Sequence, residues 1–144
     1  MRLATLRSCA LLLQVGERVK VGVEGGRSLE EVWNESLVRI GRLSHAHAAA
    51  LLMGDFVEFV ESDELGDGAE KDALRDLAAL FGLMIVERNA GDFVSILGEE
   101  DIEAVRDEVF KVLKRVRANA IGLVDAFDFS DFRLKSVLGR WART

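Results

Sequence analysis

Apolar residues recur at helical spacing along four stretches of the chain, and the most regular stripe runs through residues 99–123. Within that stretch an apolar side chain returns every three or four residues, which is the period of one helix face. Acidic residues occupy positions 99–101 and basic residues cluster at positions 114–117, an order that suits the dipole of a helix. The pattern predicts an amphipathic helix whose inward face consists of Ile102, Val105, Val109, Val112 with Leu113, Val116, Ala120 and Leu123.

A first helix is predicted over residues 2–20, and glycines between positions 21 and 27 end it. The first fifteen residues contain two arginines, no acid and a short apolar run, which superficially suggests a targeting peptide. No small-residue cleavage pattern follows, so we expect this stretch to be the first helix of the fold. Its inward face would carry Leu3, Leu6, Ala10 and Leu13, with Glu17 on the following turn.

A second, longer helix is predicted to begin at Ser28, because Ser28 and Glu31 have the spacing of a capping box. It should extend for about 30 residues, roughly 45 Å. Its inward positions would be Val32, Trp33, Leu37, Ile40, Leu43 and His47, continued by Leu51, Leu52, Phe56, Phe59 and Val60. After an acidic loop at residues 62–68, a third helix is predicted over residues 69–88, with Leu74, Leu77, Phe81, Met84 and Ile85 inward.

Four amphipathic helices joined by short or modest loops predict an all-α fold, an antiparallel four-helix bundle that forms a single domain over residues 1–144. The absence of proline favours the same interpretation. A short extra helix is predicted at residues 132–138, ended by Gly139.

Two irregular segments interrupt the helical pattern, one at residues 89–93 and one at residues 125–132. Both place short polar residues beside phenylalanine, and both leave backbone groups that need partners. Burying each of Phe127, Phe129 and Phe132 is worth roughly 1.5–3 kcal/mol, so we expect the second segment to pack against the bundle. The two segments either contact one another or lie at different ends of the bundle.

Composition and charge exclude several functional classes. The net charge is −6, made of +2 over residues 1–53, −13 over residues 54–108 and +5 over residues 109–144. An acidic middle argues against a nucleic-acid footprint, and the basic tail is either a solvated helix face or a partner surface. The single cysteine, Cys9, excludes an internal disulfide and suits a reducing compartment. No apolar run approaches the roughly 20 residues that span a bilayer.

Candidate catalytic and metal-binding residues are scarce. The residues three before His45 and His47 are not glutamates, so the di-metal signature of helical bundles is absent. These histidines are two residues apart on a helix and cannot share a metal, and we expect His47 to face the core. No phosphate-binding loop is present. Asn89, Asp92, Asp125 and Asp128 are interpreted as caps and turn-forming residues. The sequence therefore predicts no catalytic, cofactor-binding or metal-binding residue.

Three motifs carry a resemblance to a known family. They are Leu-Val-Asp-Ala-Phe-Asp-Phe at 123–129 with Leu-Lys-Ser-Val-Leu-Gly-Arg at 134–140, Arg-Asn-Ala-Gly-Asp-Phe at 88–93, and Trp33-Asn34 followed by Ser-His-Ala-His at 44–47. In order and spacing they resemble the C-terminal domain of acyl-CoA oxidases, and together they cover nearly the whole chain. Trp141 stands where that family usually has tyrosine, and the peroxisomal serine-lysine-leucine signal of many members is missing.

The resemblance implies a role without catalysis. Acyl-CoA oxidases use FAD and O2 to convert acyl-CoA to trans-2-enoyl-CoA and H2O2, in fatty acid β-oxidation. FAD, the acyl-CoA and the catalytic glutamate belong to portions before this domain, which packs on the catalytic portion and contributes to a dimer. The resemblance implies a peroxisomal location; without the signal, the alternative is the cytoplasm. A different class of function also stays open, a stand-alone, non-catalytic helical interaction module derived from this domain.

Overall fold

The computed structural model describes every residue except 1, 95, 131–132, 134 and 136–144. Within this part the regular structure is entirely helical, which confirms the predicted all-α class. The elements are α1 (Arg2–Glu24), α2 (Leu29–Glu61), η1 (Asp63–Leu65), α3 (Ala69–Arg88), η2 (Ala90–Asp92) and α4 (Glu99–Asp125), where η denotes a short 3₁₀ turn. The predicted extra helix at residues 132–138 falls largely outside the described residues.

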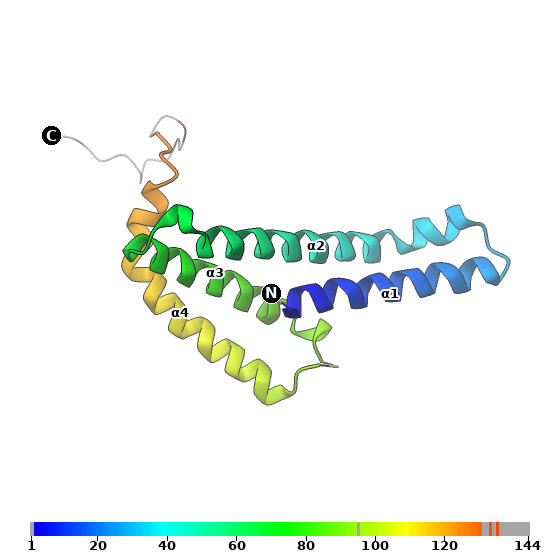
Figure 1. Cartoon of the computed structure of the whole chain (residues 1–144). Helices are drawn as coiled ribbons and strands as arrows, with labels where there is room; N and C mark the ends of the chain where they lie inside the picture. The colour runs from blue at the N-terminus through cyan, green and yellow to red at the C-terminus, as the bar shows by residue number, and fades with distance from the viewer. Residues whose placement is uncertain (1, 95, 131–132, 134, 136–144) are drawn as a thin grey trace.

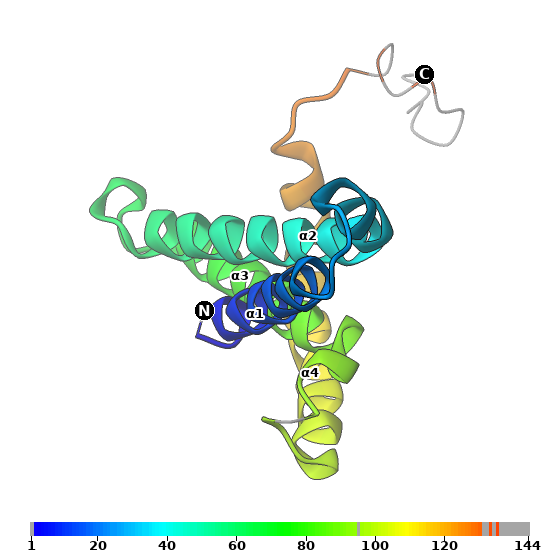
Figure 2. The ribbon, with the colours of Figure 1, turned by 90° about the vertical axis from the view of Figure 1, so that its right-hand side faces the viewer.

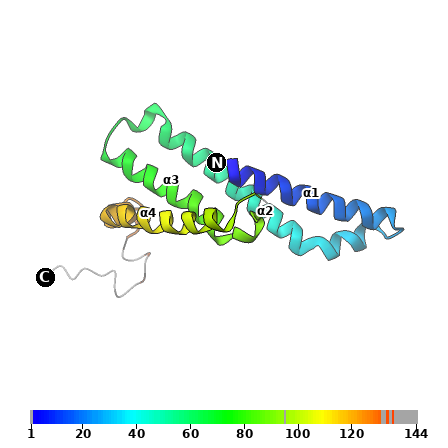
Figure 3. The ribbon, with the colours of Figure 1, turned by 90° about the horizontal axis from the view of Figure 1, so that it is seen from below.

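Helix α2 is the central element of the arrangement. α1 lies antiparallel along its N-terminal half, α3 returns antiparallel along its C-terminal half, and α4 packs on α3 (Figures 1 and 3). α1 and α3 therefore follow one another along α2, and the start of α1 lies near the end of α3. This is the place where the polar residues described below come together.

The ends of α1 and α2 follow from local sequence. The predicted capping box is confirmed: Ser28 Oγ accepts a hydrogen bond from the Glu31 backbone N–H, and the Glu31 carboxylate accepts one from Ser28 N–H, each at 3.2 Å. α1 continues four residues past the predicted end, because Gly22 stays helical. It ends where Gly26 adopts a positive φ of 86°, and Arg27 N–H donates to the Gly22 carbonyl at 3.3 Å. This is the hydrogen bonding of a Schellman C-cap.

The predicted inward face of α4 is confirmed. Val112 is 1% exposed, and the other residues of the stripe are at least half-buried except Leu113, which is exposed. Acidic residues fill the first turn as predicted, but the last turn contains no basic residue. The helix continues to Asp125, so the basic cluster at residues 114–117 lies in its interior rather than at its negative pole.

The predicted inward face of α1 is wrong for Leu6, Leu13 and Glu17, whereas Leu3 and Ala10 are partly buried. Leu6 and Leu13 are 50% and 74% exposed, whereas the buried positions are Ala4, Arg7, Ser8, Leu11 and Val15. These positions form a proper helical stripe, but it is made partly of small and polar residues. Apolar periodicity does not indicate this face, because the leucines of α1 lie mainly on the neighbouring face.

The predicted inward face of α2 is correct only in part. Trp33 and Leu37 are about half exposed, and His47 is exposed rather than directed into the core. The buried positions are Val32, Ser36, Ala46, Met53 and Val60. α2 contacts α1 and α3 through small and branched residues, while its bulkiest side chains point elsewhere.

The C-terminal corner does not pack against the helices as predicted. The rings of Phe127 and Phe129 stack on each other with centroids 5.8 Å apart, yet the two residues are 70% and 53% exposed. Phe132 lies outside the described residues. The described corner follows the end of α4, whereas η2 precedes its start, and Figures 1 and 2 show these segments well apart. The predicted contact between the two irregular segments is therefore wrong, and they lie at different ends.

Candidate functional site

A largely buried cluster of polar side chains lies where α1, α2 and η2 meet. The Asp92 carboxylate accepts a hydrogen bond from Arg7 Nε at 2.7 Å and forms a second ion pair with Arg42. The side chains of Arg7 and Asp92 are only 6% and 7% exposed, whereas that of Arg42 is 56% exposed. One carboxylate therefore joins arginines from two helices, one inside the protein and one at its surface.

Asn89 completes this junction from the end of α3. Its Oδ1 accepts a hydrogen bond from Arg7 Nη2 at 2.7 Å, and its Nδ2 donates to the Ile85 carbonyl at 2.7 Å. Asn89 is also the C-cap of α3, so the same side chain ends the helix and binds α1. Phe93, which follows η2, is completely buried. The prediction of a cap is thus confirmed for Asn89, whereas the Asp92 carboxylate forms ion pairs with two arginines instead of capping backbone N–H groups.

The junction has the chemistry of a structural site. Its two buried charges, Arg7 and Asp92, are paired, and the Asn89 amide both donates and accepts a hydrogen bond. Among the described residues, no buried side-chain nitrogen or oxygen lacks a partner. Arg7 has no counterpart in the predictions above. The only signal in the sequence is that Ala4, Arg7, Ser8, Leu11 and Val15 share one helix face, which places Arg7 among the residues that pack.

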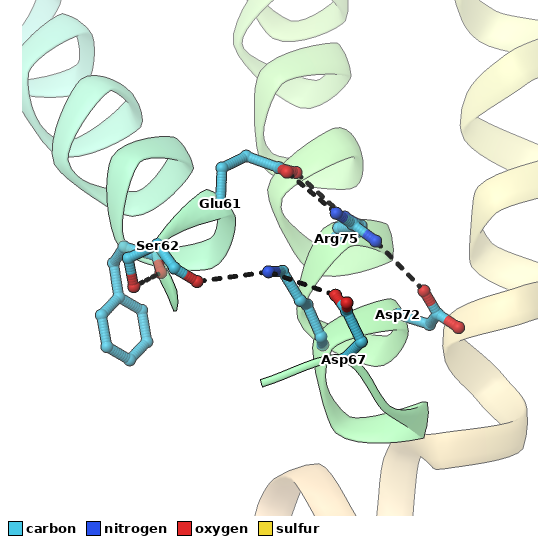
Figure 4. A network of polar contacts seen from close by, with 7 residues as sticks. Glu61, Ser62, Asp67, Asp72 and Arg75 are labelled. Carbon is cyan, nitrogen blue, oxygen red and sulfur yellow. Dashed lines mark hydrogen bonds and ion pairs between the residues drawn. The ribbon is translucent and has the colours of Figure 1, made fainter. Parts of the chain in front are cut away.

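A second polar network fixes the turn between α2 and α3 (Figure 4). Arg75 donates two hydrogen bonds to Glu61, at 2.9 and 2.8 Å, and contacts Asp72 at 3.5 Å. The hydrogen bonds from Arg75 lower the pKa of the Glu61 carboxyl. The buried Lys71 ammonium donates to the Ser62 carbonyl at 3.2 Å and lies 3.6 Å from Asp67, so a cation sits at the negative end of α2.

An exposed ion pair stands at the opposite end of α2. Arg27 directs two guanidinium nitrogens at the Glu35 carboxylate, with one hydrogen bond of 3.0 Å. Hydrogen bonding to Arg27 lowers the pKa of Glu35. An arginine–glutamate pair therefore ties the start of α2 to the loop that precedes it, and a second pair ties the end of α2 to α3.

The described residues contain no group of three or more histidine, cysteine or acidic side chains placed to hold a metal ion. His45 and His47 are both exposed on α2. Among the helices in the same part of the chain, none is long and apolar enough to cross a membrane.

The outer faces of the helices carry many large apolar side chains. Several are more than half exposed, and they occur on α1, α2 and α4 alike. They include Leu12, Leu13, Leu37, Val38, Leu51, Leu52, Phe110, Ile121 and Val124. Single apolar residues are normal on a protein surface, whereas a contiguous patch of them marks a site of association.

The solvent-exposed area is also large for a chain of this mass. The chain exposes 10972 Å², whereas a compact monomer of 15.9 kDa exposes about 7,400 Å². Counting every residue outside the described part as fully extended, at about 160 Å² each, removes about 2,200 Å². The remainder still exceeds the area of a compact protein of that size by roughly 1,900 Å². This excess is comparable with a standard protein–protein interface.

Comparison with known proteins places the chain in a family. The family model described as acyl-CoA oxidase matches residues 1–142. The chain belongs to the acyl-CoA oxidase family. It is 36% identical over 138 residues to human peroxisomal acyl-coenzyme A oxidase 1, and 36% identical over 121 residues to acyl-coenzyme A oxidase acox-1.2 of Caenorhabditis elegans. These matches cover 94% and 82% of this chain but only 21% and 18% of the relatives.

Solved structures of acyl-CoA oxidases share this fold. Acyl-CoA oxidase-1 of Caenorhabditis elegans in an apo form matches with a TM-score of 0.87 and 29% identity, over 95% of this chain and 22% of that one. Acyl-CoA oxidase-2 of the same organism, bound with FAD, ascaroside-CoA and ATP, matches with a TM-score of 0.85 and 30% identity. That match covers 93% of this chain and 20% of the oxidase. The chain thus corresponds to about a fifth of the length of the oxidases that it matches.

Proposed function

We propose that this chain is the C-terminal helical domain of an FAD-dependent acyl-CoA oxidase and serves to complete the enzyme structurally. The parent reaction would convert acyl-CoA and O2 to trans-2-enoyl-CoA and H2O2. In this role the chain packs on the flavin-bearing portion and contributes to a dimer, while it supplies no catalytic residue. The peroxisome is the proposed compartment, in keeping with the names of its relatives.

The observation that carries this proposal is the uncovered apolar surface. Leu52 on α2 and Ile121 on α4 are 60% and 79% exposed, and they lie on different helices. A domain that is part of a larger enzyme has such faces because the rest of the enzyme covers them. The buried charged residues support the same role, since Arg7 and Lys71 are both engaged in ion pairs.

A complementation experiment tests the proposal. A relative such as Caenorhabditis elegans acyl-CoA oxidase-1 is truncated before the segment that this chain matches, and is expressed with and without the chain. We expect the chain to restore soluble flavoprotein and acyl-CoA-dependent H2O2 release. A Lys111→Asp variant should complement equally, because Lys111 is exposed, whereas Val112→Asp should fail because the domain no longer folds.

The chain on its own should be colourless and inactive. The proposal that the chain has no catalytic role would be wrong if the isolated chain kept flavin absorbance through gel filtration, or if it released peroxide from acyl-CoA. A truncated oxidase that is fully active and neither binds nor needs the chain would instead favour the stand-alone interaction module.

A further inference from the structure

The α2–α3 pair is covered on one side and open on the other. On the covered side, Met53 of α2 and Gly82 and Val86 of α3 line a space together with the start of α1 and with Val105 and Val112 of α4. The opposite side has no helix of this chain across it within the described residues. The pair therefore behaves as the middle of a layered bundle from which one layer is missing.

The open side forms an apolar groove of about 450 Å³, and every residue that lines it is apolar. They are Leu52 and Phe56 of α2 and Leu77, Leu80, Phe81 and Met84 of α3. The lining residues are four positions apart on α2 and three or four positions apart on α3, so on each helix they share one face and form a ridge that borders the groove. Phe81 also packs against the core cluster of Ala4, Met53 and Ile85, so the floor of the groove is anchored to the core. A groove of this form between two antiparallel helices accommodates a third helix.

The net charge of the segment that forms the end of α2 and all of α3 favours one kind of helix. Residues 54–88, which form the end of α2 and all of α3, contain ten acidic and three basic side chains, a net charge of −7. Lys71 and Arg75 are paired with acids of the same segment, and Asp76 is paired with Arg115 of α4. Among the described residues, this leaves six acids of the segment and one base outside any ion pair, namely Asp55, Glu58, Asp63, Glu64, Glu70, Glu87 and Arg88. A second copy of this chain would bring the same negative segment to the groove if it docked through the same face, and like charges across an interface are unfavourable.

We propose that the α2–α3 groove binds an amphipathic helix with basic residues beside its apolar stripe, presented by the part of the oxidase polypeptide that lies outside these 144 residues. This inference rests on the proposed function, because it takes the missing four-fifths of the relatives' length as the source of the helix. The proposed function says only that the chain packs on the rest of the enzyme. The present inference adds the groove at which one contact forms and the charge of the helix that binds there.

Peptide binding tests the groove directly. The probe is a fluorescent helical peptide of leucine and lysine, about 18 residues or five turns long, with leucines on one face. A leucine–glutamate peptide of the same length and pattern is the matched probe. We expect the isolated chain to bind the lysine peptide at least about tenfold more tightly than the glutamate peptide in fluorescence anisotropy, a difference of about 1.4 kcal/mol.

Two variants locate the binding. Leu52→Lys places a cation in the groove at a residue that is 60% exposed, and we expect it to weaken binding of the lysine peptide at least about tenfold. Leu13→Lys makes the same change at a residue of α1 that is 74% exposed and does not line the groove, so binding should stay unchanged. Circular dichroism should show the same helix content for both variants and the parent chain.

Three results would overturn the proposal. The first is equal binding of the two peptides, and the second is equal loss of affinity in the two variants. The third is that the parent chain and Leu13→Lys form dimers in solution whereas Leu52→Lys does not, because a second copy of the chain would then occupy the groove. Failure here would leave complementation of the truncated oxidase intact, so the two ideas fail separately.

Discussion

Gly22 offers a sharp test of the packing between α1 and α2. A Cβ atom added at this position would lie 2.6 and 2.8 Å from the two methyl carbons of Val32, and 3.3 Å from its Cβ. Val32 is 2% exposed, and a valine in a helix has one strongly preferred rotamer, so it cannot turn aside. Gly22→Ala must therefore push the two helices apart at this contact.

The size of the effect follows from two opposing terms. Overpacking of a core by one carbon typically costs about 1–3 kcal/mol. Replacing glycine by alanine inside a helix contributes about 0.5–1 kcal/mol in the other direction. Gly16 in the same helix is the matched control, because a Cβ there meets nothing within 4 Å. Gly22→Ala should thus be about 1–3 kcal/mol less stable than Gly16→Ala, since the helix-propensity term is common to both.

Urea denaturation of the two variants and the parent chain measures this difference. We expect Gly16→Ala to raise the midpoint and Gly22→Ala to lower it, with unchanged slopes. A double variant that adds Val32→Ala should show a favourable coupling, because the shorter side chain removes the clash. If Gly22→Ala is as stable as Gly16→Ala, the close approach of α1 and α2 at Val32 is incorrect.

Three further predictions concern the core, the buried junction and pH. Val112→Asp should destabilise the chain by several kcal/mol, because it buries an unpaired charge, whereas Lys111→Asp on the exposed face should change the unfolding midpoint little. Asp92→Asn should cost about 3–5 kcal/mol by leaving a buried arginine unpaired, whereas Arg42→Gln, which removes a surface partner, should cost about 1 kcal/mol or less in the same denaturation assay. The lowered pKa of Glu61 implies stability that is present above the unfolded-state pKa of about 4.3 and is lost as the pH falls through the folded-state value. Glu61→Gln should therefore flatten the acid limb of a stability–pH profile, and NMR titration of the Glu61 carboxyl should give a pKa below the model-peptide value.

Helix positions were largely predictable from the sequence. The bounds of α3 and the start of α4 agree with the prediction, because a glycine ends each preceding loop and an uninterrupted apolar pattern follows. The capping box fixed the start of α2 in the same way. These features depend on neighbouring residues alone, so local reasoning suffices.

Helix faces were less predictable, for a physical reason. Trp33 and Leu37 lie on a face of α2 that is as apolar as the buried one, and apolar periodicity cannot tell which of two apolar faces meets a helix of the same chain. Arg7 escaped notice for the converse reason, because a buried cation is recognisable only once its partners are known. Those partners, Asn89 and Asp92, are more than 80 positions away.

The buried junction also sets an order of events during folding. Arg7 and Asp92 are 85 residues apart, and Asn89 is 82 residues from Arg7. α1 and α2 can form a helical hairpin as soon as both exist, but the guanidinium of Arg7 stays in water until α3 has ended and η2 has formed. During synthesis, more than half of the chain must therefore be made before Arg7 at the start of α1 can reach Asn89 and Asp92. We expect the start of α1 to gain protection from hydrogen exchange after the α1–α2 connection does, and together with η2.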